Sequence, residues 1–187
     1  VFEFFKHNGL YITKNSATAL YVGIYDDTLA FSLGRCDETT FEKINFLVEC
    51  GASPSEIANK LLRRDSLAKY RIIPKVLDSL ELYKEGEVAS IVAKEEWFKQ
   101  TGAHNRDCED ALDMIMSIAV VRIAFFVRIV NGESRVSLRS KGKIDVSKIA
   151  AEFAGGGHFN ASGCTIETLD VEKAKEIVLK EIFEIYK

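Results

Sequence analysis

The chain has 187 residues, of which 47% are hydrophobic and 28% charged, and its formal net charge at pH 7 is −3. This balance is typical of a globular protein and disfavours a disordered chain, a collagen-like fibre and a membrane protein. No apolar run approaches the roughly 20 residues of a membrane-spanning helix, and no signal peptide opens the sequence. The four cysteines lie far apart, which argues against a zinc knuckle or a disulfide framework and favours a cytoplasmic location.

The start of the chain is unusual. It begins with Val1, and its two methionines, Met114 and Met116, lie far inside the sequence. Either an initiator methionine has been removed or the chain is a piece of a longer protein. Composition leaves both explanations open.

The chain up to about Gly86 has the periodicity of helices, because apolar residues recur three and four positions apart. Gly51 is a natural C-terminal cap, and Pro54 suits a first helical turn. An apolar helical segment begins at Phe2 and stops at Asn8-Gly9. Further helices are expected over about residues 16–31, 38–50, from 54 onward, and 65–84 with a kink at Pro74.

After Gly86 the pattern becomes a mixture of strands and helices. Asn131-Gly132 separates two strand-like runs, as in a type I′ hairpin turn. Strands are expected over about residues 88–93, 122–130, 134–139 and 164–166, and helices over 107–117, from 145 to the three glycines, and 170–186. The predicted fold class is α/β, with a helical first part followed by a small mixed-sheet domain that carries a glycine-rich loop.

The glycine-rich loop is the most informative stretch. It contains Gly155, Gly156 and Gly157 in succession, followed by His158. Three glycines cost backbone entropy, so they indicate a place where side chains would obstruct something. Successive free N–H groups form an anion-binding concavity, and a histidine adds a donor near neutral pH. The alternative is a helix C-terminus followed by a flexible turn.

The preceding hairpin is locally basic. Arg135, Ser137 and Arg139 alternate with apolar residues and therefore share one face of a strand. Residues 133–148 contain five basic residues against two acidic ones, although the whole chain is acidic. A local basic patch suggests a focused anion site rather than general binding to DNA, although a solvated hairpin face is the alternative.

A second candidate is an acidic cluster, with His104 followed by four acidic residues at 107, 109, 110 and 113. Such a cluster invites a metal site. Acidic side chains in the first turn of a helix are stabilised by the helix dipole in any case, and we favour that explanation.

Residues 137–140 (Ser-Leu-Arg-Ser), 155–158 (Gly-Gly-Gly-His) and 161–163 (Ala-Ser-Gly) together resemble the substrate-binding domain of DHH-family phosphoesterases. In that family the domain follows the catalytic domain across a linker, and substrate lies between the two. The resemblance implies that Arg139 and Ser140 hold substrate phosphate. It also implies that Gly155, Gly156, Gly157 and His158 hold the nucleotide.

The resemblance extends to the first part of the chain. Residues 17–28 are similar to the last conserved block of the family's catalytic domain, in which an aspartate precedes a threonine. The matching residue is Asp27, which the resemblance makes a Mn²⁺ ligand in a two-metal site, a reasonable role for a carboxylate. Leu29 stands where the family has glycine, and Ser162 stands where it often has alanine.

The remaining metal ligands of the family are absent. The sequence contains neither the Asp-His-His triplet nor the His-x-x-x-Asp-x-Asp block. One carboxylate cannot hold two metals, so we expect this chain to bind nucleotide without hydrolysing it.

The predicted domains are residues 1–64, the C-terminal helical part of a DHH catalytic domain; residues 65–86, a linker helix; and residues 87–187, the substrate-binding domain. The predicted activity of the intact protein is manganese-dependent hydrolysis of phosphodiester or phosphate-monoester bonds in short RNA or small nucleotides, such as pApA and adenosine 3′,5′-bisphosphate. A non-catalytic nucleotide- or RNA-binding module and an exopolyphosphatase are the alternatives. No membrane partner is expected, and the oligomeric state stays open, a homodimer included.

Overall fold

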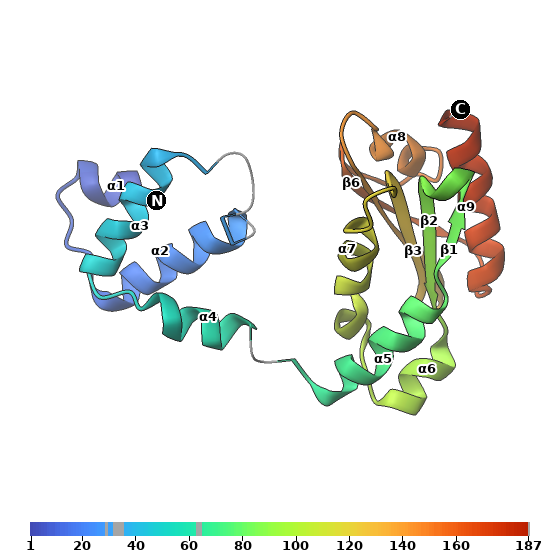
Figure 1. The fold of residues 1–187 in the computed structure, drawn as a ribbon, viewed down its shortest axis with the longest axis horizontal. Coiled ribbons are helices and arrows are strands. Elements are labelled where there is room, and N and C mark those ends of the chain that lie inside the picture. Colours follow the sequence, from blue (N-terminus) through green and yellow to red (C-terminus); the bar gives the residue numbers. More distant parts are fainter. Residues whose placement is uncertain (29, 32–35, 63–64, 187) are drawn as a thin grey trace. The chain divides into compact units, whose positions relative to one another are not determined.

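The structure is a computed structural model that describes residues 1–28, 30–31, 36–62 and 65–186 (Figure 1). The chain divides into two compact units, Val1–Arg64 (unit 1) and Asp65–Lys187 (unit 2). Among the described residues, none of the helices combines the length and apolar character needed to cross a membrane.

All secondary-structure elements in the described part of unit 1 are helices. Two of its helices begin at side-chain caps: Thr13 Oγ1 accepts from the Ser16 N–H, and the Asp37 carboxylate accepts from the Thr40 N–H. Ala17, Tyr21 and Leu47 belong to the buried core that the helices share. The helices are α1 (Phe2–His7), α2 (Lys14–Asp27), α3 (Glu38–Glu49) and α4 (Pro54–Leu62).

Helix α2 is shorter than the predicted helix over residues 16–31, because it ends at Asp27. The Thr28 hydroxyl donates to the Ile24 carbonyl at 2.7 Å and accepts from the Phe31 N–H at 3.1 Å. Ala30 and Phe31 both have positive φ angles, of 55° and 65°, so the backbone has left the helical region. The apolar periodicity continues past this turn, which explains why the sequence predicted a longer helix.

Unit 2 contains one six-stranded mixed sheet, with the strand order β1-β2-β3-β4-β6-β5. Strands β2 and β3 are parallel, and the other neighbouring pairs are antiparallel. The strands are β1 (Glu81–Tyr83), β2 (Val88–Ala93), β3 (Ile123–Val130), β4 (Glu133–Ser140), β5 (Gly156–His158) and β6 (Ala161–Ile166). The helices are α5 (Leu67–Asp78), α6 (Glu95–Thr101), α7 (Asp110–Met116), α8 (Val146–Ala151) and α9 (Val171–Ile185).

The predicted hairpin is present between β3 and β4. Asn131 and Gly132 both have positive φ angles, of 53° and 85°, as a type I′ turn requires. The turn fixes the register of β4, so that Val136 and Leu138 are buried, while Arg135 points to the opposite face and is exposed.

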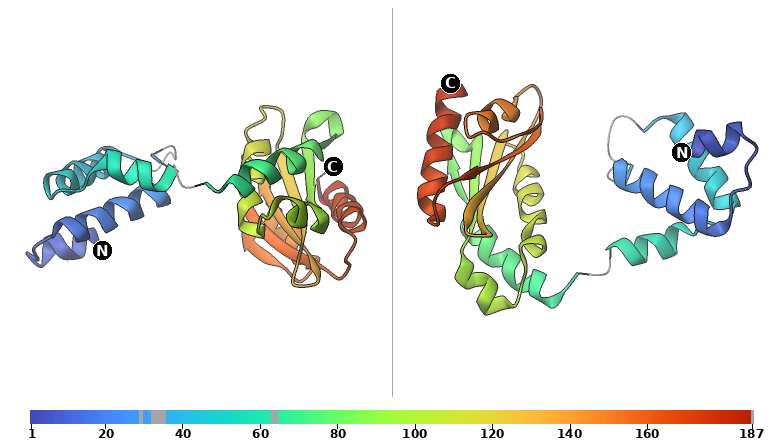
Figure 2. Two further views of the ribbon diagram at one scale, coloured as in Figure 1. Left: turned by 90° about the horizontal axis from the view of Figure 1, so that it is seen from below. Right: turned by 180° about the vertical axis from the view of Figure 1, so that it is seen from behind.

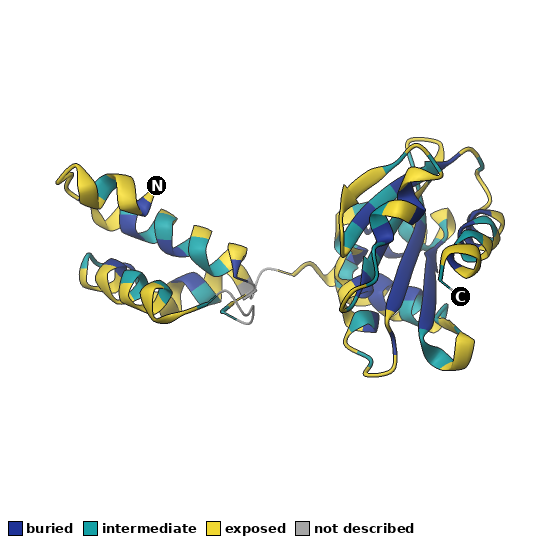
Figure 3. Ribbon diagram, turned by 90° about the horizontal axis from the view of Figure 1, so that it is seen from above, coloured by how far each residue is buried: buried dark blue, intermediate teal, exposed yellow. Residues whose placement is uncertain are grey.

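Helices cover both faces of this sheet (Figures 1 and 2). On one face, Phe125 and Leu138 pack with residues of α8 and α9. On the other face, Phe126 packs with residues of α5 and α7. Strands β2 and β3 are therefore the most deeply buried elements, and Figure 3 shows the buried residues that make up β2 and most of β3 in dark blue.

Residues 65–86, predicted as a linker helix, form more than one element and lie within unit 2. Helix α5 contains Pro74 but ends at Asp78, and β1 then pairs with β2. Lys84, Glu85 and Gly86 all have positive φ angles, which turns the chain sharply between these two strands. Neither lysine nor glutamate favours this conformation, so the sequence gives little indication of the turn.

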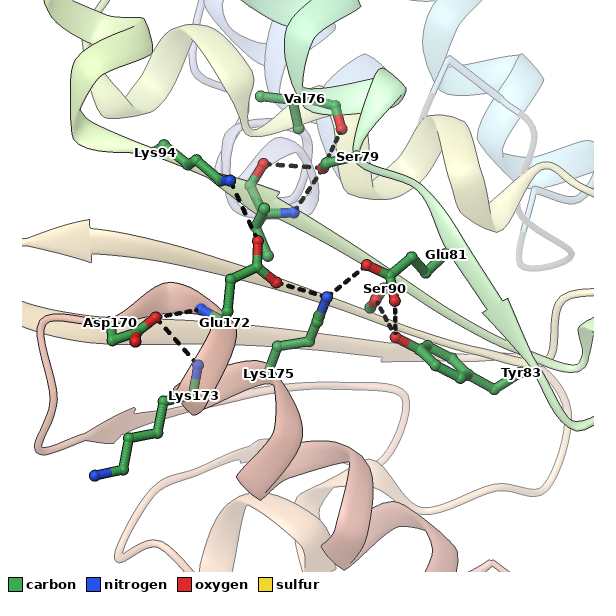
Figure 4. Close-up of polar contacts among 11 residues, drawn as sticks. Val76, Ser79, Glu81, Tyr83, Ser90, Lys94, Asp170, Glu172, Lys173 and Lys175 are labelled. Atoms are coloured by element: carbon green, nitrogen blue, oxygen red, sulfur yellow. Dashed lines mark hydrogen bonds and ion pairs between the residues drawn. The ribbon is translucent and has the colours of Figure 1, made fainter.

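A polar network ties α9 to the edge of the sheet (Figure 4). The ammonium group of Lys175, which is only 8% exposed, lies 2.5 Å from Glu81 Oε1 and 2.6 Å from Glu172 Oε2. Glu81 also accepts a hydrogen bond of 2.6 Å from the Tyr83 hydroxyl. The hydrogen bond from Lys175 holds the pKa of Glu81 below its usual value. The buried lysine is thereby compensated, as a buried charge must be.

Candidate functional site

Strand pairing brings Arg139 and His158 to the same face of the sheet. Arg139 of β4 lies opposite Ala161 of β6, and Ala161 lies opposite His158 of β5. Residues directly opposite each other point to the same side of a sheet, and neighbouring strands lie about 4.8 Å apart. The two Cα atoms are therefore roughly 10 Å apart. A helix and a loop separate these two residues along the chain, but strand pairing places them two strands apart on one face of the sheet.

The neighbouring row of the same face is made of small residues. Ser137 of β4 lies opposite Gly163 of β6, which lies opposite Gly156 of β5. A Cβ atom added to Gly156 would meet nothing within 4 Å. Packing within the protein therefore does not require glycine at position 156, whereas a ligand lying on this row would benefit from the missing side chain.

The other two glycines are explained by the strand pairing itself. A Cβ atom on Gly155 would lie 2.6 Å from the Cβ of Cys164, and one on Gly157 would lie 2.6 Å from the Ala161 carbonyl oxygen. Gly157 also has a φ of 144°. The sequence predicted that the helix starting near 145 would end on the three glycines. Helix α8 instead ends earlier, at Ala151, and a turn in which Ala154 has a φ of 53° follows it. Gly155 and Gly157 thus allow β5 to approach β6.

Ser140 points away from Arg139, because adjacent strand residues alternate between faces. It is 8% exposed, and its hydroxyl donates to the Ile144 carbonyl at 2.6 Å and accepts from Asn160 Nδ2 at 2.9 Å. In this arrangement the Ser140 hydroxyl stabilises the loop after β4. The structure therefore does not bring the Ser140 side chain together with the arginine.

A second arginine, which the sequence analysis missed, lies beside Arg139. Arg128 and Arg139 line one pocket of about 380 Å³ between α7 and the sheet. The Arg139 Nε lies 3.7 Å from Asp113, and Arg128 Nη2 lies 3.2 Å from Glu109. The Arg128 guanidinium also lies 5.1 Å from the centroid of the Phe126 ring. A single charged residue in the apolar run 123–130 was the signal that could have revealed it.

The carboxylates of the acidic cluster near α7 form hydrogen bonds and ion pairs with other groups of the protein. The Asp107 carboxylate accepts from the His104 N–H at 2.7 Å and from the Ser66 hydroxyl at 3.0 Å, and the first of these bonds holds its pKa below the usual value. Asp110 pairs with Lys69. The other two acidic residues pair with the arginines described above. These contacts favour the structural explanation of the cluster over a metal site.

Asp27 is the last residue of α2, and its side chain is exposed. With Thr28, Thr40 and Lys43 it lines a pocket of about 600 Å³ in unit 1. Lys43 also pairs with Glu3 at 2.8 Å. Across the described part of the chain, no three His, Cys, Asp or Glu side chains come together in a way that could hold a metal ion. The residues present therefore do not fit a two-metal centre, and the metal role of Asp27 stays a prediction.

Of the two departures from the family pattern, Leu29 lies outside the described residues. Ser162 is buried, and its hydroxyl donates to the Val146 carbonyl at 2.7 Å. The serine thus joins β6 to the start of α8, a bond that alanine could not make.

Known proteins are similar to this chain over most of its length. Residues 85–186 match the DHHA1 domain family. The bifunctional oligoribonuclease and PAP phosphatase NrnA of Thermus thermophilus is 27% identical over 94% of this chain and 52% of its own length. The A-adding tRNA nucleotidyltransferase of Aquifex aeolicus is 28% identical over 95% of this chain and 21% of its own length. The crystal structure of an exopolyphosphatase-related protein from Bacteroides fragilis superimposes with a TM-score of 0.86 at 28% identity, covering 92% of this chain and 51% of that one.

The mixed sheet of unit 2, in which β6 separates the arginine strand β4 from the glycine-rich strand β5, is the core of a DHHA1 domain. The chain belongs to the DHH phosphoesterase family, and its C-terminal part is a DHHA1 domain. It spans about half the length of the NrnA relative.

Proposed function

We propose that this chain supplies the substrate-binding part of a phosphoesterase that hydrolyses phosphodiester or phosphate-monoester bonds of short oligoribonucleotides or small nucleotides. The supporting observation is the strand register that brings Arg139 and His158 to one face, beside a row of small residues. Each element of that face suits a different part of a nucleotide.

Arg139 is the proposed phosphate ligand. Its side chain is 39% exposed, and its contact with Asp113 is long, so an arriving phosphate can replace the carboxylate. Exposed His158 is the second proposed donor to the ligand. Gly156 leaves room for the ligand to approach the backbone of β5.

Metal-dependent hydrolysis belongs to the proposed intact protein. The family resemblance implies Mn²⁺ with Asp27 as one ligand, but the described residues do not supply a complete site. We therefore expect the 187-residue chain to bind pApA without hydrolysing it in the presence of Mn²⁺. Mn²⁺-dependent turnover by these 187 residues alone would overturn that expectation.

A binding titration with pApA tests the substrate-binding role. Replacing Arg139 with Gln removes a charged hydrogen-bond donor, so the affinity is expected to fall about ten- to a hundredfold. Arg71→Gln is the matched control, because Arg71 is an exposed arginine on α5, and it should bind within about twofold of the wild type. Equal affinity of the wild type and Arg139→Gln would refute the proposal.

Hydrolysis is tested on a protein that includes the sequence preceding Val1. With Mn²⁺ it is expected to cleave pApA, short RNA or adenosine 3′,5′-bisphosphate. If none of the three is cleaved, or if no Asp-His-His block is found upstream, the result would instead support a non-catalytic nucleotide-binding module.

Exopolyphosphatase activity is a second candidate, because the structure with a TM-score of 0.86 is that of an exopolyphosphatase-related protein. A polyphosphate enzyme has no use for a base. Polyphosphate that competes with pApA as strongly as a nucleotide of equal charge would favour this candidate, and preference for the nucleotide would exclude it.

The proposed location is the cytoplasm, in keeping with four cysteines that are all free thiols. Size-exclusion chromatography with light scattering would decide whether the chain forms the homodimer that the sequence left open.

A further inference from the structure

Arg128 occupies a place where a charged side chain is costly. It lies in strand β3 after five buried residues, and its side chain is only 11% exposed. The register places it opposite Arg135 of β4, two residues along the same face from Ser137. It therefore shares its face of the sheet with Arg139.

The hydrogen bonding of Arg128 is incomplete. Of its five N–H donors, one meets Glu109 at 3.2 Å. Its Nε–H is buried and has no acceptor among the described residues. A buried charged donor without an acceptor is unfavourable, and each such group in a native protein calls for an explanation, of which a bound anion is one.

The carboxylate that pairs with Arg128 is open to solvent on one side. Glu109 is 58% exposed, so an anionic ligand arriving from solvent can take its place as the acceptor for the Arg128 guanidinium. Asp113 is 74% exposed in its 3.7 Å contact with Arg139. The pocket also contains Asp110, which pairs with Lys69 outside it. Two exposed carboxylates thus occupy the two arginines, and a ligand with two anionic groups can replace both.

We propose that Arg128 binds a second phosphate group of a nucleotide whose first phosphate lies at Arg139, so that this pocket selects ligands with two phosphates over ligands with one. This inference rests on the proposed function. The planar guanidinium forks suit phosphate oxygens, and Ser137 lies between the two arginines as a small neutral donor. The ligand class includes nucleoside 3′,5′-bisphosphates and 5′-phosphorylated dinucleotides.

The test compares adenosine 3′,5′-bisphosphate with AMP in titrations of the 187-residue chain. Arg128→Gln should weaken binding of the bisphosphate about tenfold while changing AMP affinity less than about twofold. Arg139→Gln should weaken both ligands. Arg71→Gln should change neither, since Arg71 lies on α5. Thermal unfolding confirms that each variant is folded.

Glu109→Gln gives an independent arm that leaves the Arg128 side chain itself in place and changes only the exposed residue that pairs with it. It removes the competing carboxylate, so binding of the bisphosphate should become a few times tighter while AMP binding is unchanged. If Arg128 served only to pair with Glu109, this variant would leave both affinities unchanged. Because Glu109 is exposed, this arm decides the question even if Arg128→Gln does not fold.

The outcomes separate the inference from the proposed function. If wild type binds neither nucleotide, the proposed function fails and the inference falls with it. If wild type binds both and Arg139→Gln weakens both, while folded Arg128→Gln behaves as wild type, only the inference fails. A Glu109→Gln variant with unchanged bisphosphate affinity overturns it as well.

Discussion

The two units of the chain bury their side chains to very different extents. In unit 2 the sheet is covered on both faces, and its buried residues form two clusters of 16 and 14 members among the described residues. The corresponding cluster of unit 1 has 7 members. Large exposed side chains occur in both units, such as Tyr11 at 86% in unit 1 and Leu169 at 67% in unit 2, so the size of the buried core is what distinguishes them. We infer that most of the folding stability resides in unit 2.

The same contrast holds for the candidate sites. In unit 2, strand pairing assembles residues that are far apart in sequence, and neighbouring strands fix their spacing. In unit 1, Asp27 is the one predicted site residue, and it lies at the exposed end of a helix. A rigid sheet is the better support for a binding site, because it holds each side chain at a defined spacing.

The largest effect is expected from removing a core aromatic ring in unit 2. Phe125 is fully buried, so Phe125→Ala should lower the free energy of unfolding of this unit by about 3–5 kcal/mol. The single tryptophan, Trp97, packs against the cores of unit 2, so its fluorescence in urea reports this unit specifically. Far-UV circular dichroism reports the helices of both units.

The matched variant in unit 1 is Leu47→Ala, which removes a fully buried side chain from the smaller core. It should lower the free energy of unfolding of unit 1, followed by circular dichroism, by about 2 kcal/mol. The urea transition followed by Trp97 fluorescence should stay in place. Equal shifts in both signals would mean that the units unfold together, and the contrast between them would be lost.

The next largest effect separates two adjacent glycines. Gly155→Ala places a Cβ 2.6 Å from the Cβ of Cys164, so β5 must move, and we expect a loss of about 1–3 kcal/mol in the fluorescence-monitored unfolding. Gly156→Ala meets open space and should change stability by less than about 0.5 kcal/mol. If Gly156→Ala weakens pApA binding, the glycine at 156 makes room for the ligand. Equal losses of stability in both variants would contradict the distinction between a glycine required by packing and one that is not.

Local patterns were sufficient to predict most elements of unit 2. The Asn131-Gly132 pair predicted the hairpin, and the alternation in residues 134–139 predicted which face of β4 is buried. Strand β1 was missed because its pairing depends on three successive positive φ angles at Lys84, Glu85 and Gly86, two of them at residues that rarely adopt them. Non-local pairing, rather than residue preference, determines that strand.

The candidate site was only partly predictable for the same reason. Arg139 and His158 were chosen as candidates from their motifs, but their common face follows from the pairing of β4, β6 and β5. The same motif assigned phosphate binding to Ser140, whose side chain points to the other face. Arg128 belongs to no motif, and it became a candidate only when its burial and its unpaired Nε were known.

Acid should weaken the link between α9 and the edge of the sheet. The pKa of Glu81 is lowered in the folded state, chiefly by the hydrogen bond from Lys175, so the pair contributes stability above the unfolded value near 4.5. That contribution is lost as the pH falls through the lower, folded pKa. Lys175→Met should cost about 1 kcal/mol at pH 7, since both carboxylate partners are about half exposed.

The variant should also lose less stability than the wild type between pH 5 and pH 3, in urea titrations followed by Trp97 fluorescence. Lys180→Met is the control, because Lys180 lies on the same helix but its side chain is 80% exposed. If the stability of Lys175→Met has the same acid dependence as that of the wild type, the hydrogen bond from Lys175 is not what lowers the pKa of Glu81.

The smallest perturbation uses the cysteines, which divide between the units. Burial raises the pKa of the Cys108 and Cys164 thiols in unit 2 to about 11, so at pH 8 only about one molecule in a thousand carries each thiolate. Cys36 and Cys50 in unit 1 are partly exposed. Because the thiolate is the reactive form, iodoacetamide should modify the unit 1 pair first and leave the unit 2 pair intact until urea unfolds it. Peptide mass spectrometry would resolve the four sites. If Cys164 were labelled as fast as Cys50, strand β6 would have to open readily, and the sheet would not be a rigid support for the site.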